Sequence, residues 1–248
     1  MQESDCQSVF VKAQVLTGGR GKGKFSNGFE GGVHLVKSDK EAFEFGEKML
    51  GHHLITKQSG PAGKLCKKVF VVEGISISKM LYAAFLLDRR SKEPILVVSK
   101  EGGMEIEQVA SQNPSSILTF PVDIDLGISE EYAMNIASIL GIEDEEPRKE
   151  LAGLFIKLFK IFTQKDATLV EINPIVLTPS NQVFCVDAKF TFDDNAAFRQ
   201  REIFSLRDFS QEDSREVEAS KFDSNYIGLD GNIGCLVNRA GLAMATMD

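Results

Sequence analysis

Hydrophobic and polar residues alternate at the start of the chain, as in a strand that buries one face. In residues 9–15 (VFVKAQV) the hydrophobic face holds Val9, Val11, Ala13 and Val15, and the other face holds Phe10, Lys12 and Gln14. A loop rich in glycine follows, TGGRGKGKFSNGFEGG. A helix is then predicted to begin at Ser38, because Ser38 and Glu41 form a capping-box pattern ahead of an apolar stripe of Ala42, Phe45, Met49 and Leu50.

The pattern in the middle of the chain predicts three strands followed by helices. The strands are predicted at 67–73, 80–88 and 94–99, and the polar turn RRSKE between the last two favours an antiparallel meander. From residue 103 to residue 140 the pattern is helical and ends at Gly141. Residues 147–164 form a strongly amphipathic pattern that predicts another helix.

Two strands, 168–177 and 181–192, are predicted on either side of the turn-forming tetrad TPSN. A tight hairpin of these strands would bring Asn173 close to Asp187. After them, a short helix is predicted over residues 193–208 (DDNAAFRQREIFSLRD), and a charged connector over residues 210–221. The tail that follows suggests a strand, a turn, a second strand and the beginning of a helix.

Composition narrows the class of protein. The chain has 248 residues, of which 43% are hydrophobic and 26% charged, as expected of a folded, soluble protein rather than a disordered one. The charged connector is the best candidate boundary, which divides the chain into domains 1–212 and 213–248. No apolar run of about 18 residues predicts a membrane span. With 28 basic and 36 acidic residues the net charge is −8, which argues against broad nucleic-acid binding.

The cysteines and histidines do not suggest a zinc site or nucleophilic catalysis. The four cysteines (Cys6, Cys66, Cys185 and Cys235) are widely separated and form no CxxC pair, which favours a reducing compartment. There are only three histidines and no GxSxG motif, so no nucleophile–base pair is proposed. No secretory signal is expected at the start of the chain, which begins abruptly and leaves an upstream mitochondrial leader possible.

The glycine-rich loop is the first candidate binding site. Seven of the 21 glycines lie between Gly18 and Gly32, directly after the strand that carries Lys12. Backbone N–H groups in such a loop approach phosphate oxygens closely, and nearby lysines and Arg20 supply positive charge. Gly18–Lys24 matches GxxxxGK, but Phe25 replaces the Ser or Thr of a P-loop and no helix follows at once, so that motif is rejected. A flexible basic loop without a ligand is the alternative, although a lysine on a buried strand is costly without an anion.

The hairpin strands hold the second candidate site. The amide oxygen of Asn173 and the carboxylate of Asp187 are hard oxygen donors, suited to Mg²⁺ beside nucleotide phosphates. On these residues alone, an ordinary solvent-exposed hairpin face is the favoured interpretation, because acidic residues are common on exposed strands. A third motif, LDGNIGCLVNRAG near the end of the chain, is compatible with a carboxylate or phosphate cradle, but such strings also make ordinary turns.

Taken in order, several of these motifs resemble the β-subunit family of succinyl-CoA synthetase (succinate–CoA ligase). They are VKAQVLTGGRGKGKFSNGFEGGVHL, TKQ, EGGMEIEQVA, DATLVEINPIV, VDAKFTFDDNAAFRQ and YIGLDGNIGCLVN, and the resemblance runs from about Val9 to Asp248. It implies an α+β ATP-grasp domain followed by the start of a flavodoxin-like α/β CoA-ligase domain. It also implies a chain truncated at both ends, since the family's first strand and helix would precede Val9.

The resemblance assigns roles to individual residues. It implies phosphate contacts from Lys12, Gly19, Arg20 and Gly21, base and ribose contacts from Glu73 and Ile75, Mg²⁺ ligands in Asn173 and Asp187, and a substrate contact from Asn238. Two departures stand out. Met80 occupies a place where many members have a glutamate near the nucleotide, and Arg239 replaces a glycine of the family's substrate loop. If that glycine needs a positive φ angle, Arg239 is expected to strain the loop.

The implied activity is a reversible one of the tricarboxylic acid cycle, in which succinyl-CoA, nucleoside diphosphate and phosphate give succinate, CoA and nucleoside triphosphate. It needs Mg²⁺ and an α subunit whose histidine carries the phosphoryl group, in a heterodimer of the mitochondrial matrix. The nucleotide is GTP or ATP, and the FSNGFEGGVHL and EGISIS segments favour GTP. The alternatives are a non-catalytic truncated fragment or isoform, and a related acid–CoA ligase that uses malate or citrate.

Overall fold

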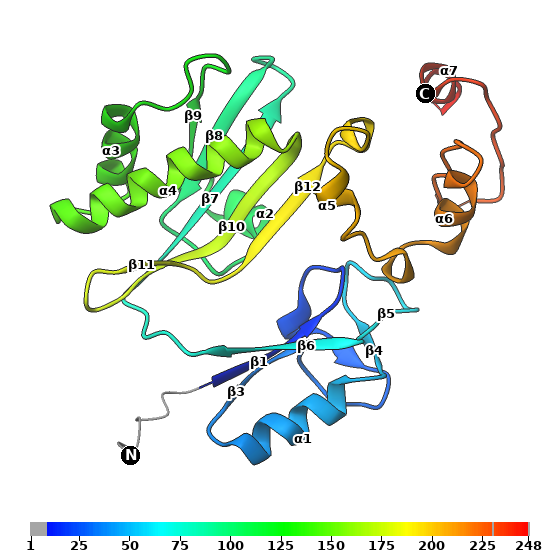
Figure 1. Cartoon of the computed structure of the whole chain (residues 1–248), viewed down its shortest axis with the longest axis horizontal. Coiled ribbons are helices and arrows are strands. Elements are labelled where there is room, and N and C mark those ends of the chain that lie inside the picture. Colours follow the sequence, from blue (N-terminus) through cyan, green and yellow to red (C-terminus); the bar gives the residue numbers. More distant parts are fainter. Residues whose placement is uncertain (1–8, 230, 248) are drawn as a thin grey trace.

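The computed structural model describes residues 9–229 and 231–247, which form two lobes and a C-terminal segment (Figure 1). The small lobe comprises residues 9–73 and the large lobe residues 79–192, with residues 74–78 as the link between them. The C-terminal segment leaves the large lobe after residue 192, runs down to the small lobe and then turns back to end in two helices that stand away from the small lobe, at the right of Figure 1. Cys6 lies outside the described residues.

Two three-stranded sheets and one helix build the small lobe. The elements are β1 (Val9–Gln14), β2 (Lys24–Phe25), β3 (Val33–Val36), α1 (Asp39–Met49), β4 (His53–Ile55), β5 (Lys64–Leu65) and β6 (Lys68–Glu73). The predicted helix start at Ser38 is confirmed: Ser38 Oγ accepts from the Glu41 N–H, and the Glu41 carboxylate reaches back to accept from the Lys37 N–H, one residue before the cap. The predicted alternation of β1 is also confirmed: Val11 and Ala13 are buried in the lobe's core, which leaves the face of Lys12 directed away from it.

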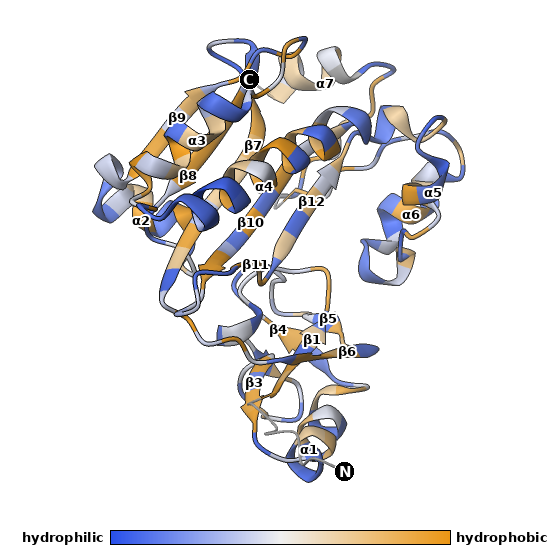
Figure 2. Ribbon diagram, turned by 60° about the vertical axis from the view of Figure 1, so that its left-hand side comes forward, coloured by the Kyte–Doolittle hydropathy of each residue, from blue (hydrophilic) through white to orange (hydrophobic). Residues whose placement is uncertain are grey.

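An antiparallel sheet and the helices on one of its faces form the large lobe. The strands are β7 (Lys79–Asp88), β8 (Glu93–Ser99), β9 (Ile117–Pro121), β10 (Ala167–Leu177), β11 (Val183–Cys185) and β12 (Ala188–Phe192), and the helices are α2 (Ile106–Gln112), α3 (Glu130–Ile139) and α4 (Glu145–Gln164). Helices α3 and α4 cover one face, where Phe85 of the sheet packs against Phe159 and Phe162 of α4. Hydrophobic residues accordingly concentrate along the strands and on the inner side of α4 (Figure 2).

One edge of β10 is paired by an interrupted strand, and this interruption positions the site. Strand β11 pairs with Ile175–Leu177 of β10, whereas β12 pairs with 167–172. Between them, the Asn173 N–H donates to the Asp187 carbonyl and the Val186 N–H donates to the Pro174 carbonyl. The predicted hairpin and its approach of Asn173 to Asp187 are therefore confirmed, but the predicted second strand, 181–192, is broken at residues 186–187.

Some of the predicted elements are wrong. Residues 103–140 were expected to be helical, yet β9 lies within this range, because Leu118 and Phe120 pack on the core while β9 supplies the hydrogen-bonding partner of β8. The charged connector contains a helix, α6 (Ser214–Ser220), whose Asp213 cap accepts from the Arg215 N–H. The predicted short helix over 193–208 is instead two separate pieces, a 3₁₀ turn η3 (Asp194–Ala196) and α5 (Arg201–Phe204).

The tail differs from expectation as well. Two strands were predicted there, but residues 225–229 and 231–239 form none, since no strand of either lobe lies alongside to pair with them (Figure 1). The expected helix is present as α7 (Ala240–Met247). Within the described ranges, no helix has the length and apolar character needed to cross a membrane.

Candidate nucleotide and metal site

Lys12 points from the small lobe toward the interruption between β11 and β12. Its Nζ donates to the Val186 carbonyl at 3.4 Å, across 174 residues of sequence. Burial lowers the pKa of the Lys12 ammonium group, and the nearby Arg20 lowers it further, whereas Asp187 raises it. A partly desolvated ammonium group of this kind gains from a bound anion, which is the environment that the sequence pattern predicted for Lys12.

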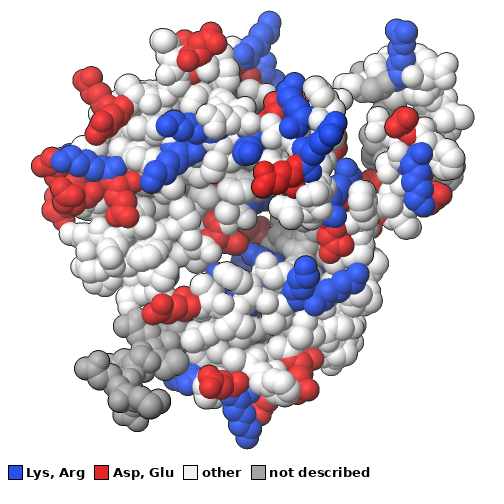
Figure 3. Space-filling model, in the orientation of Figure 1, with Lys and Arg blue, Asp and Glu red and all other residues white. Residues whose placement is uncertain are grey.

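Arg20 makes a second contact between the lobes at the same place. Its Nη2 lies 2.6 Å from Asp187 Oδ2, and its Nη1 donates to the Ala13 carbonyl at 3.1 Å. The guanidinium group is 18% exposed and the Asp187 carboxylate 49% exposed, so the ion pair borders solvent. Basic and acidic side chains thus gather where the two lobes meet (Figure 3). Lys12 and Arg20 both converge on residues 186–187.

The glycine turn that carries Arg20 has the backbone conformation for which glycine is suited. Gly19 has φ = +72° and precedes a 3₁₀ turn, η1 (Arg20–Lys22). A Cβ placed on Gly21 meets no atom within 4 Å, so this turn borders open space. The turn is held from behind, because the Arg20 carbonyl accepts from the N–H groups of Gly23 and Gly32. Its geometry therefore leaves room for a ligand beside the Arg20 turn.

Asn173 is held by a loop of the large lobe. Its Oδ1 accepts from the Gly103 N–H at 2.7 Å, and its Nδ2 donates to the Met104 carbonyl at 2.8 Å. These two bonds fix which end of the amide is oxygen. The carbonyl-type Oδ1 keeps a second lone pair, which is free for another partner.

The donors present fit Mg²⁺ only as part of a larger ligand set. Asn173 and Asp187 are adjacent across the β10 edge and supply an amide oxygen and a carboxylate, both hard donors. In the described part of the chain, no three His, Cys, Asp or Glu side chains gather closely enough to form a metal site by themselves. A cation here would need further oxygens from water or from a ligand's phosphates, which is the usual coordination of Mg²⁺.

Sequence reasoning assigned no role to Glu171, which lies on β10 opposite Lys189 of β12. Burial raises the pKa of the Glu171 carboxyl group; the Lys189 ammonium group opposes this shift, whereas Glu107 and Asp187 add to it. The two-residue alternation already put Glu171 on the face of Asn173, so this signal was present in the sequence. Glu171 adds a third oxygen-bearing side chain to the region of Asn173 and Asp187.

Glu73 and Ile75 lie where the chain passes from β6 into the link. Glu73 is exposed at the end of β6 and pairs with Val9, while Ile75 is half-buried in the link. The adjoining sheet face, which also carries Lys12, is largely apolar: Phe10 pairs with Val72 and Lys12 with Phe70. Glu73, which pairs with Val9, therefore belongs to the opposite face of the sheet from Lys12 and lies at the end of the strand.

Asn238 is not brought to the junction of the lobes where Lys12 and Arg20 converge. It is exposed in the tail just before α7, which lies apart from the junction of the lobes (Figure 1). Arg239 is not among the described non-glycine residues with a positive φ angle, so the backbone condition on which the expected strain depended is not met in this structure. Met80 lies on β7 opposite Val176, and its Sδ is 3.0 Å from the position a Cβ would take on Gly103, so it packs under the loop that holds Asn173.

Comparison with protein families supplies independent information. The ATP-grasp domain family matches residues 1–177 of this chain. That range holds Lys12, the glycine turn and Asn173, but stops before Asp187.

Two proteins of Dictyostelium discoideum are similar over nearly the whole chain. The mitochondrial β subunit of the ADP-forming succinate–CoA ligase is 52% identical over 242 residues, which cover 98% of this chain and 54% of that protein. The mitochondrial β subunit of the GDP-forming ligase is 51% identical over 241 residues, which cover 97% and 57%. The chain thus spans just over half the length of these curated relatives.

Among solved structures, the ATP citrate lyase of Methanothrix soehngenii in complex with citrate and coenzyme A has a similar fold. The TM-score is 0.63 at 18% identity, and the match covers 88% of this chain and 47% of that one. At this identity the similarity concerns the fold alone.

Proposed function

This chain belongs to the ATP-grasp domain family, and from that premise we propose that it is the nucleotide-binding part of a succinate–CoA ligase β subunit. The relatives at 51–52% identity carry that name. The observation that carries the proposal is the convergence of Lys12 and Arg20, from the small lobe, on residues 186–187 of the large lobe. We propose that this junction of the lobes binds a nucleoside triphosphate together with Mg²⁺.

In the proposed site each residue has a physical task. Lys12 and Arg20 balance the negative charge of the phosphates, and the backbone of Gly19 and Gly21 allows close approach. Asn173 and Asp187 would hold Mg²⁺, which neutralises charge on the transferred phosphoryl group. Glu73, at the end of β6, and Ile75, in the link that follows, are proposed to contact the ribose and the base.

The phosphoryl acceptor is proposed to be a histidine of an α subunit that pairs with this chain. The three histidines of the chain belong to the small lobe: His34 is bonded to the Gly31 carbonyl, and His52 and His53 lie at the start of β4. The structure gives none of them a contact with the described residues Lys12, Asn173 or Asp187, in keeping with an acceptor from outside. Succinate and CoA are the proposed co-substrates, with Asn238 as a proposed substrate contact.

The nucleotide is proposed to be GTP or ATP, and the FSNGFEGGVHL and EGISIS segments favour GTP. Relatives that form ADP and GDP match this chain about equally, so they add no preference. We propose the mitochondrial matrix as the location, following the mitochondrial naming of these relatives. Domain limits of 1–212 and 213–248 remain part of the proposal.

The proposal is tested by co-expressing a version extended to the length of the relatives with an α subunit. After incubation with Mg²⁺ and γ-labelled GTP or ATP, labelling of an α-subunit histidine is expected with at least one nucleotide. Absence of labelling with both nucleotides would contradict the proposed activity. The two parallel reactions also report the preferred nucleotide.

A further inference from the structure

Gln211 is buried where the C-terminal segment crosses the small lobe. It ends a 3₁₀ turn, η4 (Phe209–Gln211), and its side chain is only 6% exposed. Buried glutamine is uncommon, because its amide must find hydrogen-bond partners on both ends. Both partners of its side-chain amide, Leu16 and Leu65, come from the small lobe, although the preceding residues of its segment follow from the large lobe.

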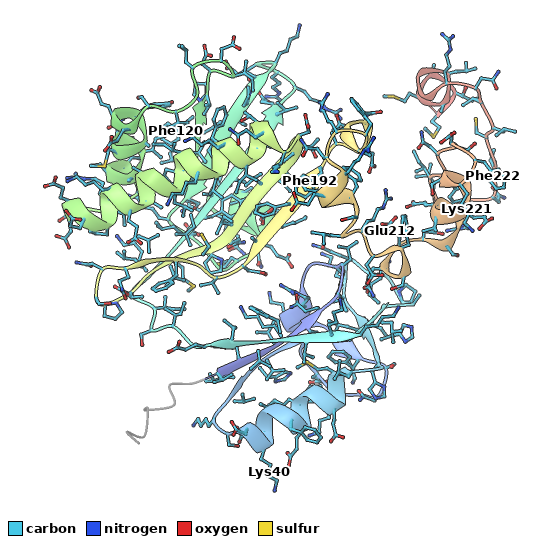
Figure 4. All side chains as sticks on the ribbon, viewed as in Figure 1. Lys40, Phe120, Phe192, Glu212, Lys221 and Phe222 are labelled. Atoms are coloured by element: carbon cyan, nitrogen blue, oxygen red, sulfur yellow. The ribbon has the colours of Figure 1, made fainter. Side chains whose placement is uncertain are left out.

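The turn that presents Gln211 is fixed by its own side chains. Arg207 donates from Nε and Nη2 to the two carboxylate oxygens of Glu212, at 2.6 and 2.7 Å, which ties together the residues that flank the turn. The Asp208 carboxylate caps the turn by accepting from the Ser210 N–H. Glu212 lies where the segment passes between the small lobe and α6 (Figure 4). The position of Gln211 is thus set before its side chain reaches the small lobe.

Both ends of the Gln211 amide contact backbone that supports the glycine turn. Oε1 accepts from the Leu16 N–H at 3.3 Å, just after β1, and Nε2 donates to the Leu65 carbonyl at 2.9 Å, at the end of β5. Lys64 Nζ also donates to the Gln211 carbonyl. Leu16 is three residues from Gly19, so Gln211 connects β5 to the segment that leads from β1 into the Arg20 turn.

We propose that Gln211 is a positioning residue for the glycine turn. By fixing Leu16 against β5, it holds residues 16–19 in the path that places Arg20 toward Asp187. This inference rests on the proposed nucleotide site, because the turn's task there is to contact phosphates. It also makes the segment that follows the large lobe a part of the nucleotide site.

A comparison of two glutamines tests this role in the 248-residue chain. Gln211→Met keeps the length of the side chain but removes both amide bonds. Gln200→Met is the matched control, because Gln200 is on the same segment but its Nε2 donates only within the large lobe, to the Gln164 carbonyl and to Asp166. Three quantities are measured for each variant: hydrogen exchange of residues 16–19, affinity for Mg²⁺-nucleotide, and affinity for Mn²⁺ alone.

In Gln211→Met, faster exchange at residues 16–19 and roughly three- to tenfold weaker nucleotide binding are expected, as for the loss of about one buried hydrogen bond. Mn²⁺ affinity should stay at the wild-type value, since Asn173 and Asp187 belong to the large lobe. Gln200→Met should match wild type in nucleotide affinity and in exchange at 16–19. If Gln211→Met fails to fold, Gln211→Glu takes its place: it keeps an acceptor for the Leu16 N–H but loses the bond to the Leu65 carbonyl, and it should bind nucleotide more weakly than wild type and than Gln200→Met.

Several results would overturn the inference. The first is wild-type hydrogen exchange together with wild-type nucleotide affinity in the Gln211 variants. The second is an equal loss of Mn²⁺ and nucleotide affinity in those variants. The third is the same loss of nucleotide affinity in Gln200→Met. A wild-type chain that binds no Mg²⁺-nucleotide would overturn the proposed function as well as this role. A wild-type chain that binds nucleotide, with no effect at Gln211, would overturn the role alone.

Discussion

Arg20 of the small lobe and Asp187 of the large lobe form an ion pair with 2.6 Å between Nη2 and Oδ2, across 167 residues of sequence. Both residues have proposed tasks with other partners, Arg20 with phosphates and Asp187 with Mg²⁺. Binding of Mg²⁺-nucleotide would therefore replace the Arg20–Asp187 ion pair by two others, Arg20 with a phosphate group and Asp187 with Mg²⁺. The new partners carry more charge than the side chains they replace. The pair marks the place where the lobes would receive the ligand.

Replacing Arg20 should change the affinity for a metal ion and the affinity for Mg²⁺-nucleotide in opposite directions. Arg20→Gln is expected to raise Mn²⁺ affinity in the absence of nucleotide, because Asp187 loses a competing partner. It is expected to weaken Mg²⁺-nucleotide binding by roughly tenfold or more, as for a lost charge-assisted hydrogen bond. Titrations followed by the electron paramagnetic resonance of free Mn²⁺, and by calorimetry for nucleotide, measure both.

Lys22→Gln supplies the charge-matched control, because Lys22 is exposed on the same turn and has no ion-pair partner among the described residues. Equal Mn²⁺ affinities in the Arg20→Gln and Lys22→Gln variants would contradict competition at Asp187. They would instead indicate a general effect of charge.

The loop that holds Asn173 requires glycine at its base. A Cβ on Gly102 would lie 2.4 Å from the Leu81 carbonyl oxygen, so Gly102→Ala should lift the loop and release the Asn173 amide. We expect weaker Mn²⁺ binding in this variant. Gly153→Ala is the control: it lies within α4 with nothing within 4 Å of the new Cβ, and it should stabilise the fold by up to about 1 kcal/mol without changing Mn²⁺ affinity. Unchanged Mn²⁺ affinity in Gly102→Ala would count against the role of the loop.

Local patterns in the sequence predicted several parts of the site. The alternation of β1 directed Lys12 away from the core, and the TPSN turn brought Asn173 beside Asp187. Both follow from periodicity and turn chemistry within about twenty residues. The chemistry of these residues made them candidates for their roles, which the family resemblance then assigned, and these roles remain predictions.

Contacts between distant segments were not predictable in this way. Nothing in the local pattern pairs Arg20 with Asp187 or inserts Gln211 beside Leu16, because each contact depends on how the lobes and the C-terminal segment pack. Strand β9 was missed for a related reason: its short apolar run fits a helix or a strand, and only the free edge of β8 decides between them.

The large-lobe core should dominate stability. Leu151 of α4 is 1% exposed, and Leu151→Ala should lower the free energy of unfolding by about 2–5 kcal/mol through lost burial and a cavity. Leu126 is 86% exposed, and Leu126→Ala should stay within about 0.5 kcal/mol of wild type. Urea unfolding measures both variants. Similar losses in the two would contradict the position of the core.

Stability in acid should depend on Asp166, whose carboxylate accepts hydrogen bonds from Arg199 and Gln200. These bonds lower the pKa of Asp166 to about 2 from its usual 3.8. A carboxyl group with a lowered pKa stabilises the fold above its unfolded-state value, and this contribution is lost as the pH falls from 3.8 through about 2. Thermal unfolding should show Asp166→Asn less stable than wild type at pH 7, with the difference shrinking below pH 4. A difference that is constant from pH 7 to pH 2 would contradict this ionic role.

The most direct test of the central claim is a titration of the Asp187→Ala variant with Mg²⁺-GTP and with Mg²⁺-ATP. Asp125→Ala, which removes an exposed carboxylate elsewhere on the large lobe, is the control. We expect wild type and Asp125→Ala to bind at least one nucleotide and Asp187→Ala to bind neither. Unchanged binding of both nucleotides by Asp187→Ala would contradict the assignment of the junction between the lobes as the Mg²⁺-nucleotide site.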